Sequence, residues 1–119
     1  MQLRLSTRML GDRVLVVDCL GRIVFGEETA VLRDSVRNLL DQHRQIVLNL
    51  SGVTYIDSGG LGTLVALYTT ARNAGASIKL SALTQRTNDL LQITKLVTIF
   101  EVFDNDDQAA RSFEKGAAA

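Results

Sequence analysis

The sequence predicts a single α/β domain with a mixed, mostly parallel sheet of four to five strands and about four helices. Three observations lead to this fold class. Short apolar runs with strand character alternate with stretches of helical periodicity over almost the whole chain. One run, at residues 46–50, is apolar at nearly every position, as in a strand that is buried on both faces. A tight turn joins the first two strands, so we expect the first strand to pair antiparallel with the second.

The N-terminal half carries the patterns of a hairpin and of a first helix. Apolar and polar residues alternate at residues 3–9, which predicts a half-exposed strand, and residues 13–20 predict a more buried one. Gly11 and Asp12 between them are a turn signal. Gly21 and Gly26 bracket a predicted loop. The helix that follows has apolar residues at helical spacing, which are Val31, Leu32, Val36, Leu39 and Leu40.

The C-terminal half repeats the alternation of strand and helix. Residues 58–73 carry a helical packing stripe, and Gly75 is a stop signal after it. Residues 77–83 predict a strand, Thr87 is expected to cap a short helix, and residues 97–103 predict the last strand. An Asp/Asn cluster at residues 104–107 precedes a final helix. We predict a domain that spans residues 1–115 and a frayed tail over residues 116–119.

Composition and charge argue against several classes of protein. The 119 residues include 13 basic and 13 acidic side chains, without the basic bias of a nucleic-acid binder. No apolar stretch is long enough to span a bilayer, and the start lacks the apolar segment of a signal peptide. A single cysteine, Cys19, fits a reducing compartment. We therefore expect a cytoplasmic domain that binds neither nucleic acid nor membranes.

The most informative segment is residues 55–63, which reads YIDSGGLGT. It follows the apolar run and opens a helical pattern, so Asp57, Ser58 and three glycines are placed where a buried strand leads into a helix. A helix N-terminus has unpaired backbone N–H groups and a partial positive charge, which suit a phosphate. In sheets of this kind, sites also gather beyond the carboxyl ends of the strands. The segment is therefore a candidate site for a phosphate, either as a ligand or attached to Ser58.

The residues alone leave two interpretations of this turn open. In the first, Ser58 is exposed between small residues and accepts a phosphate from another protein, adding about −1.5 to −2 charges that the helix dipole tolerates. In the second, the segment is only a glycine-rich turn that is capped by Asp57 or Ser58. Glycine costs about 1 kcal/mol of helix propensity against alanine. Three glycines within four positions therefore indicate that something else has to lie close to this turn.

Residues 48–62, LNLSGVTYIDSGGLG, closely resemble the signature of the STAS domain of anti-sigma factor antagonists. Length and element order agree over essentially the whole chain, which implies an STAS-like fold. In that bacterial family of transcription regulators, the serine after the aspartate is phosphorylated by a partner kinase that doubles as an anti-sigma factor. The unphosphorylated antagonist binds this kinase and frees the sigma factor, and a PP2C-type phosphatase resets the serine. The chain departs from the family at Gly59, where Ser or Thr is common.

The resemblance implies that Ser58 is the phosphorylation site, that the chain is not an enzyme, and that it needs no cofactor. The expected partner is an anti-sigma factor serine kinase, which binds the loop around Ser58 with the loop of residues 21–26 as a second patch. Since the two loops follow neighbouring strands, we expect them to lie side by side. The predicted partner-binding residues are Thr54, Tyr55, Asp57, Ser58, Gly59, Gly60, Leu61, Gly62, Arg22 and Phe25.

Other classes match the sequence less well. A receiver domain needs an acidic pair after its first strand, where this chain offers only isolated Asp12 and Asp18. A Walker-type phosphate loop needs a Gly-Lys-Ser/Thr ending, which is missing. A serine hydrolase needs a histidine base, and His43 lies at the end of the first predicted helix. No His/Cys cluster suits a transition metal. The remaining alternative is an STAS scaffold or a subunit of a transport or signalling assembly, in which Ser58 is structural.

Overall fold

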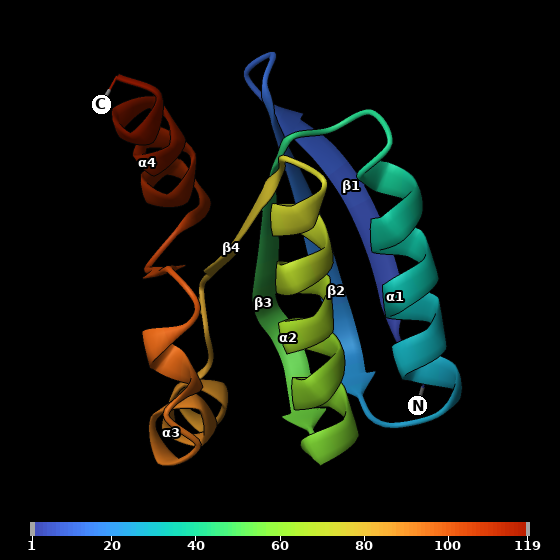
Figure 1. Ribbon diagram of the computed structural model, residues 1–119. Coiled ribbons are helices and arrows are strands. Elements are labelled where there is room, and N and C mark those ends of the chain that lie inside the picture. The colour runs from blue at the N-terminus through green and yellow to red at the C-terminus, as the bar shows by residue number, and fades with distance from the viewer. Residues whose placement is uncertain (1, 119) are drawn as a thin grey trace.

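The computed structural model describes residues 2–118, with side chains described as far as Glu114. Within these residues a five-stranded sheet of order β1-β2-β3-β4-β5 is flanked by four α-helices and one 3-10 helix (Figure 1). The strands are β1 (Arg4–Leu10), β2 (Val14–Ile23), β3 (Gln45–Ile56), β4 (Ser77–Ser81) and β5 (Val102–Phe103). The helices are α1 (Glu27–Leu39), α2 (Ser58–Asn73), α3 (Gln85–Ile93), the 3-10 helix η1 (Leu96–Thr98) and α4 (Asp106–Ala118).

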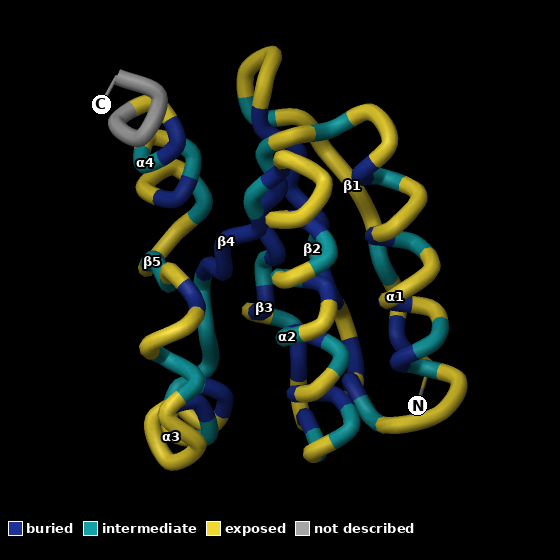
Figure 2. The backbone as a smooth tube through the Cα atoms, viewed as in Figure 1, coloured by how far each residue is buried: buried dark blue, intermediate teal, exposed yellow. Residues whose placement is uncertain are grey.

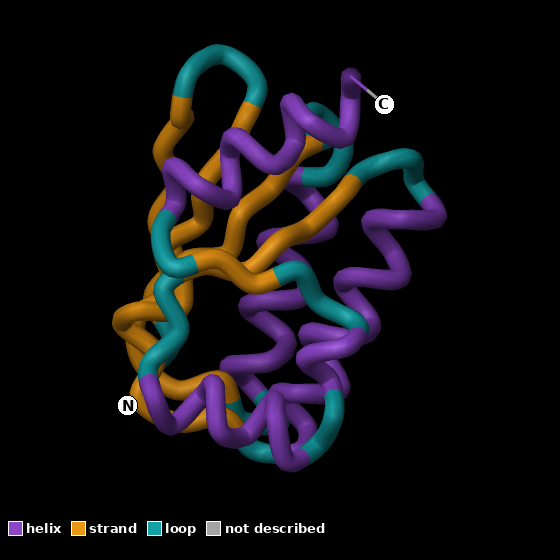
Figure 3. The backbone as a smooth tube through the Cα atoms, turned by 90° about the vertical axis from the view of Figure 1, so that its left-hand side faces the viewer, coloured by secondary structure: helices purple, strands orange, loops and turns teal. Residues whose placement is uncertain are grey.

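The sheet topology confirms the predicted α/β class. Strand β1 runs antiparallel to β2, and every other neighbouring pair is parallel. Helices α1 and α2 pack side by side on one face of the sheet (Figure 1). Helix α4 packs on the other face and crosses the strands there (Figure 3). The connections of β2, β3 and β4 therefore all leave from the same edge of the sheet, the carboxyl edge.

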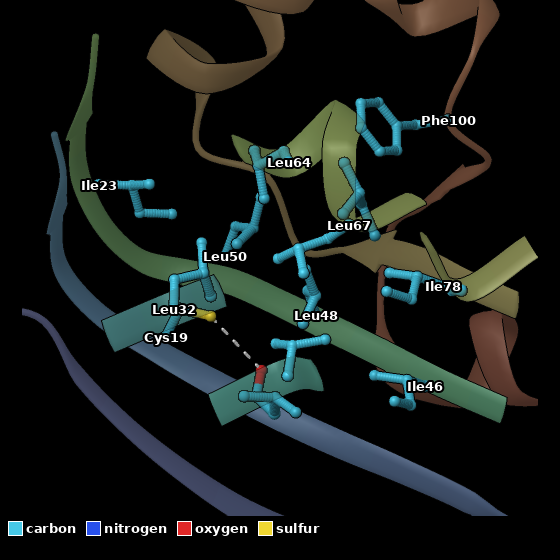
Figure 4. Packing of buried hydrophobic residues seen from close by; sticks show 14 of the residues in the cluster. Cys19, Ile23, Leu32, Ile46, Leu48, Leu50, Leu64, Leu67, Ile78 and Phe100 are labelled. Atoms are coloured by element: carbon cyan, nitrogen blue, oxygen red, sulfur yellow. Dashed lines mark hydrogen bonds between the residues drawn. The ribbon is translucent and has the colours of Figure 1, made fainter. Parts of the chain in front are cut away.

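The first half of strand β3, residues 46–50, is the centre of the core and is buried on both faces, as predicted. Ile46, Leu48 and Leu50 belong to the larger apolar cluster under α1 and α2, whereas Val47 belongs to the smaller cluster under α4. Figure 4 shows the larger cluster from close by. Cys19 lies in it, and burial raises the pKa of its thiol to about 12, so the thiol stays protonated. The rigid layer that β3 forms with its neighbours fixes the position of the segment that follows it.

Helix α4 is held on its face of the sheet by Asp106. The carboxylate accepts hydrogen bonds from Ser81 Oγ at 2.6 Å and from Asn49 Nδ2 at 3.0 Å, and it pairs with the Arg8 guanidinium. Burial raises the pKa of Asp106, but the hydrogen bonds from Ser81, Arg8 and Asn49 outweigh it and leave the pKa below its ordinary value. One carboxylate therefore ties β1, β3 and β4 to the start of α4.

Strand β2 runs three residues further than predicted, to Ile23. Parallel pairing of Arg22 with Tyr55 and of Ile23 with Ile56 extends both β2 and β3 toward the carboxyl edge. The predicted loop of residues 21–26 shrinks accordingly to its last three residues. Pairing with a strand that lies some 30 positions away in the chain is a tertiary effect, which overrides the two glycines that mark a loop locally.

Three other expectations were wrong in detail. The short helix α3 is capped by Thr84, whose Oγ1 accepts the backbone N–H of Thr87 at 3.1 Å, and not by Thr87. Strand β4 ends at Ser81 because Ala82 adopts a φ of 56°, outside the β region. Only the last two residues of the predicted strand 97–103 form β5, since η1 precedes it. The predicted frayed tail, residues 116–119, reaches beyond the described residues and stays a prediction.

None of the helices within residues 2–118 combines the length and the apolar character that crossing a membrane requires.

Candidate functional site

Helix α2 begins at Ser58, as the sequence predicted, and Asp57 is its N-cap. Asp57 has an extended backbone conformation, with φ −96° and ψ −177°, and its Oδ1 accepts the backbone N–H of Gly60 at 2.8 Å. This hydrogen bond satisfies one of the unpaired donors of the first helical turn. Ser58 is therefore the first helical residue, and it is exposed. Residues 54–62, which were predicted as a loop, are instead the end of β3, the linking residue Asp57 and the start of α2. We call this segment the acceptor loop.

The carboxylate of Asp57 also binds the neighbouring loop, residues 24–26, which we call the β2–α1 loop. The backbone N–H of Phe25 donates to Asp57 Oδ2 at 3.1 Å and to Oδ1 at 3.2 Å. In return the backbone N–H of Asp57 donates to the carbonyl of Ile23 at 3.3 Å. The two loops that were predicted to lie side by side are thus joined directly at the carboxyl edge of the sheet (Figure 1).

Backbone donors set the charge of this site. The N–H of Gly60, then that of Phe25, and further the N–H of Gly59 hold the pKa of Asp57 below its ordinary value, against a small opposing effect of burial. Asp57 is therefore ionised at neutral pH, and its charge is balanced by N–H groups rather than by a basic side chain. Ser58 stands directly beside this fixed negative charge.

Two of the three motif glycines are required because a neighbouring segment lies too close for a side chain. A Cβ at Gly60 would contact the carbonyl oxygen of Ile23 and would lie 2.9 Å from Ile56 Cγ2. A Cβ at Gly59 would lie 2.5 Å from Phe25 Cβ and 3.2 Å from its Cα. Gly62 has open space around it. The first turn of α2 therefore packs against Ile23 at the end of β2 and against Phe25 of the β2–α1 loop, and the missing side chains make these contacts possible.

The predicted partner-binding residues fall into three groups by burial. Gly60 and Leu61 are buried and support the site from beneath, while Asp57 and Gly59 are half-buried. The others are exposed at the carboxyl ends of β2 and β3, in the β2–α1 loop and at the start of α2, which are Thr54, Tyr55, Gly62, Arg22 and Phe25. Figure 2 shows the exposed β2–α1 loop at this edge. Whether a partner binds these residues stays a prediction.

Arg86 of α3 also belongs to this surface and was missed by the sequence analysis. Its guanidinium lies 5.9 Å from the centre of the Tyr55 ring, and its Nη1 donates to the carbonyl of Thr54 at 3.3 Å. Arg22 is the strand-pairing partner of Tyr55 in the neighbouring strand β2. No local pattern could have indicated this contact, because 31 positions separate Arg86 from Tyr55.

The surface holds no group of side chains suited to a metal. Across the part of the chain that the structure describes, no three Asp, Glu, His or Cys side chains converge as metal ligands. What the site presents is a hydroxyl on a helix N-terminus, an ionised carboxylate beside it and an exposed aromatic ring. These features suit recognition and covalent modification of the serine by another protein.

Comparison with known proteins agrees with the fold and with the motif. The STAS domain family matches residues 11–109 of the chain. An anti-sigma-B factor antagonist of Bacillus subtilis (strain 168) is 35% identical over 72 residues, which make up 60% of this chain and 66% of that relative, just under two thirds of its length.

Two solved structures share the fold at low sequence identity. A putative anti-sigma factor antagonist from Thermotoga maritima has a TM-score of 0.81 and 22% identity, covering 91% of this chain and 92% of that one. The murine solute carrier 26 family member A9 anion transporter has a TM-score of 0.77 and 14% identity, covering 96% of this chain and 22% of the transporter. With its sheet order, its glycine turn and the match over residues 11–109, the chain belongs to the STAS domain family.

Proposed function

We propose that this domain is a non-catalytic anti-sigma factor antagonist that is switched by phosphorylation of Ser58. In its unphosphorylated form it binds a serine-kinase anti-sigma factor, and so releases a sigma factor. The observation that carries the proposal is the place of Ser58, exposed as the first residue of α2 at the edge where the acceptor loop and the β2–α1 loop meet. The named relative from Bacillus subtilis and the Thermotoga maritima structure support it.

The geometry suits a serine that is a substrate for another enzyme. Ser58 is exposed, and its neighbour Gly59 has no side chain to shield the hydroxyl. A phosphate there would add about −1.5 to −2 charges at neutral pH, close to the positive end of the α2 dipole. Asp57 already directs its charge toward the N–H groups of Gly60 and Phe25, so the fold itself should accept the new charge.

The partner would feel the modification far more strongly than the fold. A kinase that phosphorylates Ser58 must cover the acceptor loop, so the phosphate would lie inside or at the border of the interface. Burying a dianion without a matching cation costs several kcal/mol of binding free energy. Since about 1.4 kcal/mol corresponds to a tenfold change in affinity, such a cost is enough to release the partner.

A second candidate is a non-switching STAS domain in a transport or signalling assembly. The murine anion transporter contains this fold as 22% of its chain, so the same architecture exists within a much larger protein. In that case Ser58 would be a structural residue of the first helical turn, and its charge state would not affect the assembly.

The test is phosphorylation by the serine-kinase anti-sigma factor that a pull-down with this domain recovers. With ATP, one phosphate should be added and peptide mapping should place it on Ser58. Ser58→Ala should bind the kinase and take up no phosphate, and a PP2C-type phosphatase should reverse the modification of the wild-type chain.

Ser58→Asp serves as the matched variant for the charge. It should weaken kinase binding at least about tenfold while thermal stability changes by less than about 0.5 kcal/mol. A recovered kinase that binds tightly but leaves Ser58 unmodified would exclude the switch and favour the scaffold. Unfolding of Ser58→Asp would show that the start of α2 does not tolerate a negative charge at this position.

A further inference from the structure

We infer that Phe25 inserts into an apolar pocket of the kinase and that Gly59 is the specificity determinant that makes room for Phe25. The inference rests on the proposed function and names the chemistry of the partner surface. It rests on three observations: the exposure of Phe25, the fixed backbone beneath it, and the direct contact between Phe25 and the residue after the phosphate acceptor.

Phe25 is the most exposed of the large apolar side chains that the structure describes. It is 80% exposed, against 44% for Tyr55 at the same edge. Exposed apolar residues are common on domain surfaces, but a whole phenyl ring in water stands out among them. Rings of this kind bury 150–250 Å² when a partner covers them, and aromatic residues dominate the binding energy of many interfaces.

The backbone that carries the ring is held in place before any partner binds. The N–H of Phe25 binds the Asp57 carboxylate, and the carbonyl of Val24 accepts the N–H of Thr29 at 3.2 Å. At the start of α1, the N–H of Gly26 donates to Thr29 Oγ1 at 3.0 Å, and the Thr29 hydroxyl donates to the carbonyl of Gly26 at 3.0 Å. A loop whose backbone is already ordered loses little backbone freedom on binding, so more of the contact energy remains as affinity.

Gly59 places the start of α2 directly against Phe25. A Cβ at position 59 would lie 2.5 Å from Phe25 Cβ, 3.1 Å from its Cδ1 and 3.2 Å from its Cα. Such distances are too short for carbon atoms, so any side chain at position 59 has to push Phe25 away. The glycine at the position where the motif commonly has Ser or Thr therefore sets the position of the aromatic ring.

The same contact explains why the occupant is the kinase. An enzyme that modifies Ser58 must bring its active site onto the serine hydroxyl, and the next residue, Gly59, touches Phe25. The kinase surface beside its active site must therefore cover the ring. Because Phe25 is apolar, and Val24 and Gly26 beside it carry no charge, an apolar pocket matches this part of the surface.

The experiment is a double-mutant cycle on kinase binding, measured by calorimetry with the full unphosphorylated domain. Phe25→Ala should weaken binding at least about tenfold, as loss of an anchoring aromatic does. Gly59→Ser should also weaken binding in the wild-type background. In the Phe25→Ala background, Gly59→Ser should have a much smaller effect on kinase binding. Alanine keeps the Cβ that a side chain at position 59 meets, so the backbone still shifts, but no ring is left to displace from the kinase pocket.

Two controls separate this contact from general surface effects. Met9 is 46% exposed at the hairpin end of β1, and Ile93 is 79% exposed at the end of α3. Met9→Ala and Ile93→Ala should bind the kinase as the wild-type chain does. Thermal unfolding of each variant shows whether it is folded. Phe25→Leu keeps an apolar side chain and should therefore retain part of the affinity for the kinase.

The possible results distinguish the inference from the proposed function. Wild-type affinity of Phe25→Ala, or an equal effect of Gly59→Ser in both backgrounds, would overturn the inference even while Ser58 is still phosphorylated. A kinase that binds the wild-type chain without modifying Ser58 would overturn the proposed function, whereas the binding cycle would still report on Phe25.

Discussion

Two aspartates each hold the start of a helix in this domain, and they do so by different means. Asp57 holds α2 at the carboxyl edge and receives its hydrogen bonds from backbone N–H groups of Gly60 and Phe25. Asp106 holds α4 on the opposite face and receives side-chain donors from three strands. Both have a lowered pKa, but the side chain of Asp106 is only 14% exposed, whereas Asp57 is half-buried beside an exposed serine.

The difference separates a partner-facing position from a structural one. Backbone donors come with the turn itself, so the side chains around Asp57 are free to serve recognition, as Ser58 and Phe25 are proposed to do. The donors around Asp106 are the side chains of Arg8, Asn49 and Ser81, and all three share this one carboxylate as their acceptor. Loss of Asp106 should therefore damage the fold, whereas changes of the exposed side chains beside Asp57, those of Ser58 and Phe25, should act mainly on binding.

The largest effect is expected for Asp106→Ala. The substitution leaves Asn49 and the buried Ser81 without their shared acceptor, whereas the half-exposed Arg8 keeps its ion pair with Asp18. We expect a loss of about 2–4 kcal/mol in the free energy of unfolding, measured by chemical denaturation. Asp107→Ala is the matched control, because Asp107 is exposed in the same helical turn and should change stability by less than about 0.5 kcal/mol. Equal losses for the two variants would contradict the assigned role of Asp106.

A smaller effect is expected for the glycines of the acceptor loop. Gly60→Ala forces a Cβ onto the carbonyl of Ile23, so we expect a loss of about 1–3 kcal/mol in the free energy of unfolding. Gly62→Ala meets open space inside the same helix and should be neutral or stabilising by up to about 1 kcal/mol. If Gly60→Ala is as stable as Gly62→Ala, the close approach of α2 to the β2–α1 loop is not what the turn requires.

The contrast between the two aspartates also shows what could be predicted from sequence. The start and the end of α2 could be predicted, and its cap could be limited to Asp57 or Ser58, because an acid, glycines and helical periodicity are local signals. The network of Asp106 could not, since its donors lie 25 to 98 positions away in the chain. The extension of β2 to Ile23 and the contact of Arg86 with Tyr55 likewise depend on strand pairing and packing.

At the site itself, the motif indicated which residues meet at the carboxyl edge but not how they touch. The sequence marked Gly59 as a departure from the family pattern, and the structure adds a physical reason, because Phe25 occupies the space of a side chain there. Phe25 is separated from Gly59 by 34 positions, so only the paired strands β2 and β3 bring the two together. The hydrogen bonds from the Phe25 N–H to Asp57 could not be predicted for the same reason, because the two residues are far apart in the chain.

The smallest stability effect, and the one that tests the comparison most directly, is the pH dependence of Asp57→Asn. Asparagine keeps an oxygen that can cap α2 but removes the charge. The pKa of Asp57 is lowered in the folded state, so its charge stabilises the fold fully above the ordinary Asp pKa of about 3.9. This contribution is lost as the pH falls through the lower folded-state pKa. The wild-type chain should therefore be more stable than Asp57→Asn at pH 7, and the stabilities of the two chains should converge in strong acid.

Denaturation curves across this range provide the measurement, with Asp34→Asn on the exposed side of α1 as the control for charge removal. If the difference in free energy of unfolding between the two chains stays constant with pH, the N–H groups of Gly60 and Phe25 do not stabilise the charge of Asp57. Asp57 would then differ from Asp106, whose charge is stabilised by its donors.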